Sequence, residues 1–443
     1  MAFAVNLRVG LASGILKSTT ERCLDLRLHF LGGCREVGRS AVAVETNQKR
    51  LLMDYGVMMG DVVGYPTHIS PKDLDAIFLS HAHLDHSGLL PLFYLRRNVP
   101  LYAVEPTFEF TNLLIKDFIH ISGYFLPYEY VDLETMMRSC IPMPYRREFE
   151  VAGIKAKFLN AGHIPGSSQI LIESEGKRIL YTGDINPSET RTLGSADQDY
   201  GDLDAIVTEA TYAAEDHPNR AMVESEFVSR VKDVVERGGV ALVPAFGVGR
   251  SQEIATVLAA HDFRYPVFMD GMALDATEIL GNHPGSLKDE ELFKRTVKKT
   301  KWVNNWNDRR KVVKTPSVII SPAGMLKGGA AMFYMEQVAK SKKNAVFLVS
   351  FQIPGTPGSV LLEKKRFVLQ GKSRKVEAEV EKFDFTSHGG RSDLHALLSK
   401  MSKKTKVFAV HGAETNCVKL AAWASKELGL EAHAPKAGEG FEI

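Results

Sequence analysis

The chain has 443 residues, of which 44% are hydrophobic and 24% are charged. This is the composition of an ordinary globular protein, so fibrous and intrinsically disordered classes are excluded, and the length suggests two or three domains. Lysine and arginine number 55 against 53 aspartate and glutamate residues, so contact with nucleic acid has to come from local patches and not from overall charge.

The first 210 residues carry short β-rich runs that glycine turns separate. Strands are expected at residues 26–31, 40–45, 50–53, 76–79, 155–159, 169–173 and 179–181. Helical periodicity covers residues 88–96 and 109–118. Together these patterns predict a strand-rich α/β region with long loops.

From about residue 213 the chain alternates strands with helices. Strands are expected at 240–244, 267–270, 317–321 and 345–350. Helices are expected at 250–261, between residue 270 and about residue 299, and at 329–340. This rhythm is typical of a doubly wound parallel sheet. Further strands and a last helix at 415–428 follow an irregular stretch. We therefore expect one domain formed by residues 1–212 (with an N-terminal extension) and 361–443, interrupted by a second domain at 213–360.

Cysteine content and hydropathy indicate a reducing, aqueous compartment. The four cysteines form no close pair, which disfavours a disulfide framework and a cysteine zinc site. The first twenty residues lack the apolar core of a signal peptide. No apolar run reaches the ~20 residues that span a membrane. We therefore expect a cytoplasmic protein with no membrane contact.

A cluster of metal-competent side chains directly follows the expected strand 76–79. In the run SHAHLDH, the candidate ligands are His81, His83, Asp85 and His86. Imidazole and carboxylate groups suit zinc and related divalent ions. Three later strand ends each add one candidate ligand, His163, Asp184 and His411. A single histidine after a strand is usually structural, but the ordered set predicts a metal centre.

This order of motifs resembles the metallo-β-lactamase superfamily, whose fold is an αββα sandwich. The resemblance implies that His81, His83 and His163 hold one metal ion. It implies that Asp85, His86 and His411 hold a second ion and that Asp184 bridges the two. Asp54 matches the upstream aspartate of the superfamily and is expected to orient the ligands without coordinating.

Three further motifs resemble those of the β-CASP ribonucleases, in which a doubly wound parallel-sheet domain interrupts the sandwich. They are TEATY at 208–212, FTSH at 385–388 and VHGAE at 410–414. The resemblance covers residues 25–443 and is greatest to archaeal relatives of the cleavage-and-polyadenylation endonuclease, grouped with archaeal ribonuclease J. The chain corresponds to their short form without RNA-binding KH domains. Residues 1–24 match no motif of the family.

The resemblance implies hydrolysis of single-stranded RNA by a hydroxide held between two zinc ions, with manganese as an alternative metal. The products would be a 5′-phosphate and a 3′-hydroxyl. His388 is the expected general acid, and Glu209 is expected to orient it. Asp85 and Asp184 belong to the catalytic set because they hold the metals. A homodimer is also a fair expectation from the family.

Glycine-rich loops before helices are candidate phosphate sites, because helix N-termini expose free N–H groups. The first comprises Gly247, Gly249, Arg250 and Ser251, and the second comprises Gly328 and Gly329. Ser387 beside the expected acid is a further candidate for substrate contact. Taken alone, the first loop is explained more simply as a tight turn capped by Ser251. The basic stretch 288–314, which includes Trp306, fits either RNA binding or a solvated helical face.

The sequence leaves the mode of cleavage open. We favour a 5′→3′ exoribonuclease because added RNA-binding modules that would position an internal cut are lacking. An endoribonuclease of the cleavage-factor type is the alternative. A DNA nuclease, a small-molecule hydrolase and a catalytically inactive scaffold are weaker alternatives, the last because all seven expected ligands are present.

Overall fold

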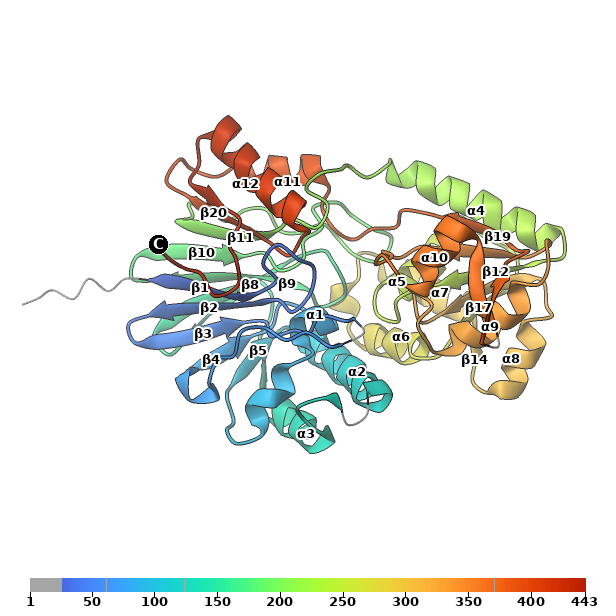
Figure 1. Cartoon of the computed structure of the whole chain (residues 1–443), viewed down its shortest axis with the longest axis horizontal. Coiled ribbons are helices and arrows are strands. Elements are labelled where there is room, and N and C mark those ends of the chain that lie inside the picture. The colour runs from blue at the N-terminus through green and yellow to red at the C-terminus, as the bar shows by residue number, and fades with distance from the viewer. Residues whose placement is uncertain (1–25, 61, 123–124, 370) are drawn as a thin grey trace, which may run out of the picture.

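The computed structural model describes residues 26–443, with the exception of 61, 123–124 and 370, so the extension 1–24 lies outside the described residues. Two lobes lie side by side, and the chain passes from the first lobe to the second and back (Figure 1). No helix in the described part of the chain is long and apolar enough to cross a bilayer.

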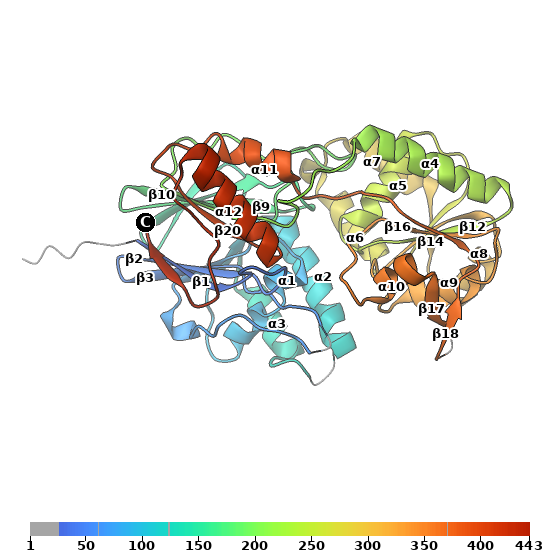
Figure 2. The same ribbon diagram turned by 45° about the horizontal axis from the view of Figure 1, so that its top comes forward.

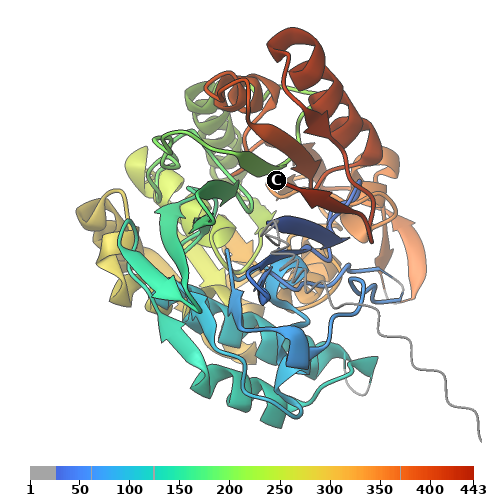
Figure 3. The same cartoon turned by 90° about the vertical axis from the view of Figure 1, so that its left-hand side faces the viewer.

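The first lobe is built on two seven-stranded sheets that face each other. The strands of the first sheet, in spatial order, are β22 (Gly440–Glu442), β1 (Arg27–Gly32), β2 (Ala41–Thr46), β3 (Lys49–Met53), β4 (Ala76–Phe78), β5 (Leu101–Ala103) and β6 (Cys140–Pro142). Those of the second are β21 (Ala432–His433), β20 (Lys406–Val410), β11 (Ala205–Glu209), β10 (Lys177–Tyr181), β9 (Ser168–Ser174), β8 (Ile154–Asn160) and β7 (Glu148–Val151). Strand β22 pairs with β1, so both ends of the described chain lie in one sheet (Figure 3).

Alternation of apolar side chains gives each sheet of the first lobe two buried faces. The inner faces share a core that includes Phe30, Phe78 and Phe158. The outer face of the first sheet is covered by α1 (Leu84–Ser87), the 3₁₀ helices η1 (Pro71–Asp73) and η2 (Leu90–Tyr94), α2 (Glu105–Ser122) and α3 (Tyr130–Arg138). The outer face of the second is covered by α11 (Arg391–Leu398) and α12 (Glu414–Leu428). The layers form an αββα sandwich.

The second lobe is a six-stranded parallel sheet with helices on both faces. Its strands, in spatial order, are β14 (Thr300–Val303), β13 (Val267–Asp270), β15 (Ser317–Ser321), β12 (Val240–Pro244), β16 (Ala345–Leu348) and β19 (Glu379–Lys382). Its helices are α4 (Arg220–Glu236), α5 (Arg250–Ala260), α6 (Ala273–Asn282), η4 (Pro284–Ser286), α7 (Glu290–Lys299), α8 (Trp306–Val312), α9 (Ala330–Val338) and α10 (Pro357–Lys364). The hairpin of β17 (Arg366–Leu369) and β18 (Lys372–Lys375) extends from this lobe (Figure 2). This is the expected doubly wound domain.

Two elements differ from the sequence expectation. Strand β19 pairs with β16 over Glu379–Lys382, so the inserted sheet extends beyond residue 360, where we expected the first domain to resume. An edge strand rich in lysine and glutamate carries no signal of the sheet to which it belongs. The expected helix at 88–96 is a short η2, because Gly88 ends α1 and Pro91 sits at the start of the next turn.

The two lobes pack directly against each other beside the metal-ligand loop. An apolar cluster joins Ala82 and Phe110 of the first lobe to Val248 and Leu280 of the second. The carboxyl ends of the parallel strands in the inserted sheet therefore face the first lobe, where ligand sites of open α/β sheets lie.

Candidate metal centre and active site

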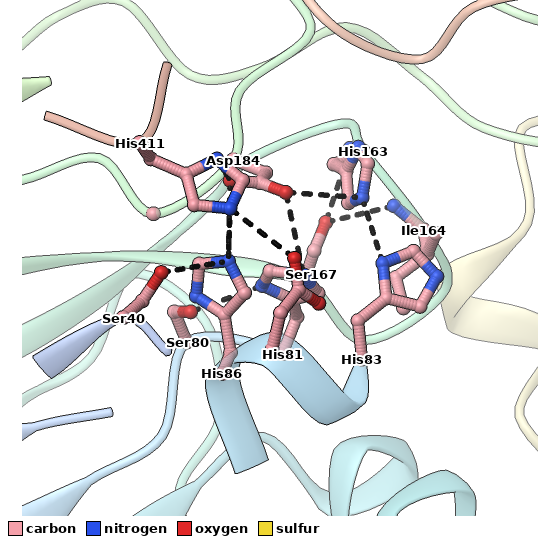
Figure 4. A network of polar contacts seen from close by, with 12 residues as sticks. Ser40, Ser80, His81, His83, His86, His163, Ile164, Ser167, Asp184 and His411 are labelled. Atoms are coloured by element: carbon pink, nitrogen blue, oxygen red, sulfur yellow. Dashed lines mark hydrogen bonds and ion pairs between the residues drawn. The ribbon is translucent and has the colours of Figure 1, made fainter. Parts of the chain in front are cut away.

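The histidine-rich segment follows β4 and enters the four-residue helix α1. His83 takes the N-cap position, and His86 lies in the last turn of the helix. His81 and His86 are 1% and 0% exposed, whereas a histidine is usually only partly buried. At the two ends of this short helix, His83 faces His163 and His86 faces His411 (Figure 4).

The structure brings the seven expected ligands together from four places in the chain, namely the segment 81–86 and the positions of His163, Asp184 and His411. The ligand atoms of one group all lie within 4.8 Å of one another, and the group comprises His81, His83, His163 and Asp184. A second group with the same spacing comprises Asp85, His86 and His411. Asp184 lies between the groups: its Oδ2 is 3.6 Å from Nε2 of His81, and its Oδ1 is 3.4 Å from Nε2 of His86.

The donor set fits divalent metal ions. Nδ1 of His83 lies 3.2 Å from Nε2 of His163, and Nε2 of His86 lies 3.3 Å from Nε2 of His411. Two nitrogens bound to one tetrahedral zinc, each ~2.0–2.1 Å from it, lie about 3.3 Å apart. Nε2 of His81 and Oδ1 of Asp184 are buried and make no hydrogen bond within the described chain. A metal ion would satisfy both atoms.

The electrostatics of the first group favour neutral imidazoles, the form that binds metal. Burial, together with the neighbouring imidazoles, lowers the pKa of His81 and His163. Burial likewise lowers the pKa of His83 to about 4. Burial opposes the charge on Asp184, but the imidazoles of His411 and His86 reverse this effect and lower the pKa of the carboxyl group. At neutral pH the group therefore presents free nitrogen lone pairs around a carboxylate.

Asp54 lies behind this cluster and uses both carboxylate oxygens within the protein. Oδ1 accepts a hydrogen bond from the backbone N–H of Ser80 at 2.7 Å. Oδ2 accepts from the Ser80 hydroxyl at 2.6 Å, from the Tyr181 hydroxyl at 2.8 Å and from Nδ1 of His86 at 2.7 Å. The bond to Nδ1 turns Nε2 of His86 toward Asp184. Asp54 is therefore placed to orient a ligand and not to coordinate.

Replacing Asp54 with asparagine is expected to weaken metal binding by about 10- to 100-fold, because the amide cannot accept all four bonds and His86 loses its fixed orientation. Competition with a chelator measures the change. Asp197→Asn is the matched control, since Asp197 accepts from Asn160 and Arg146 on the same domain but is not part of the cluster. Native zinc affinity in the Asp54 variant would contradict this role.

His388 and Glu209 form a close pair beside the metal ligands. Nδ1 of His388 lies 2.9 and 3.0 Å from the two carboxylate oxygens of Glu209. Glu209 is itself fixed, because its Oε1 accepts from the backbone N–H of Ile185 at 2.8 Å. Burial disfavours a charge on His388, but the Glu209 carboxylate outweighs burial and raises the His388 pKa to about 9. The side chain is 18% exposed, so the protonated ring borders the open side of the site.

The segment that carries His388 is tied to the first metal group and to Arg250. The backbone carbonyl of Ser387 accepts from Nδ1 of His163 at 2.8 Å, and the Ser387 hydroxyl accepts from Nη2 of Arg250 at 3.1 Å. Nε and Nη1 of Arg250 are buried without a hydrogen-bond partner in the described chain. A guanidinium with two free donors is suited to a phosphate group.

Packing accounts for the other residues of the first glycine loop. The Ser251 hydroxyl donates to the carbonyl of Phe246 at 2.7 Å and closes the turn. A Cβ at Gly247 would lie 2.8 Å from the Met272 side chain, and Gly249 has a φ of +81°. Gly329 caps α9 with a φ of 65°, next to Gly328. Phosphate binding by Gly247, Gly249, Ser251, Gly328 and Gly329 stays a prediction.

Sequence reasoning missed two residues that support the cluster, Ser80 and Tyr181. Ser80 contacts both Asp54 and, at 3.0 Å, Nδ1 of His81. Each of the two directly adjoins a recognised motif, Ser80 before the histidine run and Tyr181 before Thr182-Gly183-Asp184. Their position next to the motifs is the only signal that could have indicated them.

Three family matches follow the chain in order. Residues 35–222 match the metallo-beta-lactamase superfamily, residues 251–361 match the Beta-Casp domain, and residues 373–435 match the Zn-dependent metallo-hydrolase RNA specificity domain. A solved structure of a protein of unknown function from Enterococcus faecalis V583 has a TM-score of 0.58 and 14% sequence identity, and the match covers 95% of this chain and 100% of that one. This structural likeness supports the fold.

Archaeal relatives match over nearly the whole chain. RNase aCSPSF2 of Saccharolobus solfataricus is 40% identical over 94% of this chain and 85% of its own length. Probable RNase MJ4 of Methanocaldococcus jannaschii is 34% identical over 94% of this chain and 100% of its own length. The fold, the ordered motifs and these matches together show that the chain belongs to the β-CASP family of metallo-β-lactamase ribonucleases, which are metal-dependent hydrolases acting on RNA.

Proposed function

We propose that the chain hydrolyses single-stranded RNA with two zinc ions and leaves a 5′-phosphate and a 3′-hydroxyl. The observation that carries this proposal is the pair of ligand groups joined by Asp184, with the His388–Glu209 pair beside them. The match to an RNA specificity domain supports RNA as the substrate. Predominantly histidine ligation favours zinc over manganese.

When bound, the metal ions would supply a hydroxide nucleophile and neutralise charge on the phosphate. His81, His83 and His163 would hold one ion, and Asp85, His86 and His411 would hold the other, with Asp184 shared. Asp54 keeps His86 in the orientation that coordination needs. Arg250 would donate to a phosphate oxygen of the RNA through its free Nε and Nη1.

His388 would donate a proton to the 3′ oxygen that leaves. Its Nδ1 faces Glu209, and within the described chain no group bonds its Nε2, so this nitrogen is the one available to the substrate. The Glu209 carboxylate keeps the ring in one orientation and favours its protonated form. General acids of this kind typically contribute about 10²- to 10⁴-fold to the rate.

A 5′→3′ exoribonuclease is the mode we favour, with Arg250 as a candidate ligand for a terminal phosphate. An endonuclease is the second candidate. Transcription termination factor FttA of M. jannaschii is 34% identical over 89% of this chain and 68% of its own length. Termination of a transcript by cleavage requires a cut within the RNA, which an endonuclease makes. Cytoplasmic location and a homodimer stay predictions from the sequence.

Circular RNA distinguishes the two modes. Zinc-loaded protein is mixed with one RNA sequence in two forms, linear with a 5′-monophosphate and covalently closed. An exonuclease is expected to degrade the linear form and leave the circle intact, because a circle has no end to enter the site. Gel electrophoresis measures both rates. Opening of the circle at a comparable rate would establish internal cleavage, and no cleavage of either form would count against the proposed ribonuclease activity.

A further inference from the structure

An exposed aromatic side chain, Phe351, contacts Tyr212, whose ring adjoins that of His388. Phe351 follows β16 in the inserted domain and is 39% exposed. Its ring meets that of Tyr212 edge-on, with centroids 6.2 Å apart, and the Tyr212 ring lies 5.9 Å from that of His388. Phe351 belongs to no apolar core cluster within the described chain. Because the ring is accessible and contacts a neighbour of His388, a base of bound single-stranded RNA could stack on it.

The two rings come from different lobes. Tyr212 lies at the exit of β11 and forms an isolated β-bridge with Gly390, two residues after His388. Phe351 lies in the inserted domain, after the carboxyl end of β16. The contact between them therefore forms one wall across the junction of the lobes, next to the proposed acid.

The chemistry of the reaction identifies the nucleotide nearest this wall. The proposed acid protonates the leaving 3′ oxygen, so the nucleotide upstream of the broken bond must place its ribose at His388. Its base is attached to that ribose, and Tyr212 and then Phe351 follow the imidazole in a chain of ring contacts. Bases of single-stranded RNA expose their π faces, and aromatic side chains bind them by stacking.

We propose that Phe351, supported by Tyr212, stacks on the base of the nucleotide immediately upstream of the cleaved bond. This inference rests on the proposed role of His388, because that role determines which side of the bond faces the wall. Stacking on one face tolerates any base, so the site would fix position without selecting sequence.

An RNA that lacks a single base tests the contact. A 5′-monophosphorylated ten-nucleotide RNA is compared with two versions, abasic either upstream or downstream of the bond that is cut first, in single-turnover reactions. The upstream abasic RNA is expected to react about tenfold more slowly with the native protein. Phe351→Leu should slow cleavage of the intact RNA by a similar factor. On the upstream abasic RNA the variant and the native protein should react equally fast.

Two further variants complete the experiment. Phe351→Trp keeps an aromatic face and should retain the sensitivity to the missing base. Phe125→Leu removes an aromatic side chain that is 88% exposed in the first lobe, between α2 and α3, and should behave as the native protein. Thermal denaturation confirms that each variant is folded.

Several outcomes would overturn the proposal. Equal slowing by Phe351→Leu on intact and upstream abasic RNA would show that the side chain does not act through this base, as would a native rate on the intact RNA. If the effect of Phe351→Leu disappears only on the downstream abasic RNA, the assigned nucleotide is wrong, and so is the side on which His388 acts. Metal-dependent ribonuclease activity would stand in each case, so the two failures are distinguishable.

Discussion

Asp184→Ala is expected to lose both bound metal and ribonuclease activity. The carboxylate lies between the two ligand groups, and each oxygen faces an imidazole of a different group, His81 on one side and His86 on the other. Removing a shared ligand weakens both sites and also leaves the cluster of imidazoles without its central negative charge. We expect a loss of affinity beyond the about 10- to 100-fold typical of residues behind the ligands. Elemental analysis gives the zinc content per chain.

Asp85→Ala is the matched comparison for Asp184→Ala. Asp85 belongs to one group only, and its Oδ2 lies 3.2 Å from Nε2 of His411. The Asp85 variant should therefore lose metal from one site and retain it at the other. An Asp184 variant that binds two zinc ions with native affinity would show that this carboxylate does not bridge.

His388→Ala is expected to retain both metals and to lose activity by about 10²- to 10⁴-fold, the range for loss of a general acid. Within the described chain, His388 belongs to neither of the two groups that contain the seven expected ligands, and its Nδ1 is already bonded to Glu209. Zinc content and single-turnover cleavage, measured on the same preparation, show whether His388 acts as a general acid or as a metal ligand. Loss of zinc from this variant would instead make His388 a metal ligand.

Glu209→Gln provides the control for the acid. The Glu209 carboxylate raises the pKa of His388, so its removal should lower that pKa. An acid works only while protonated, and activity falls as the pH rises through its pKa. The alkaline limb of the rate profile should therefore shift to lower pH in the Glu209 variant relative to the native protein. An unchanged limb would mean that another group supplies the proton.

Regular strands were predictable because burial on both faces leaves a clear apolar signal. The expected strands 240–244, 267–270 and 317–321 coincide with β12, β13 and β15 of the inserted sheet. By contrast, β19 lies at the edge of the same sheet, and its sequence Glu-Val-Glu-Lys contains a single apolar residue. Its membership depends on pairing with β16, a long-range contact that local sequence does not encode.

The chemistry of the ligand set was also evident in the sequence, because imidazole and carboxylate groups recur at strand ends in a recognisable order. The residues that support these ligands were not evident in the sequence. Tyr181 reaches Asp54 across the space between the two sheets, and no pattern along the chain relates the two positions. The same holds for the contact of Arg250 with Ser387, which joins the two lobes.

The sequence by itself determined the kind of fold, the identity of the candidate ligands and the expected family, because these depend on residue types and on their order. Only the tertiary structure decided how those residues are used. It gave Asp54 four hydrogen bonds and closed the turn before α5 with Ser251. It left two donors of Arg250 without a partner among the residues that the structure describes. It also brought Phe351 next to Tyr212. Such roles depend on contacts between residues that are far apart in the sequence, and these contacts form only when the chain folds.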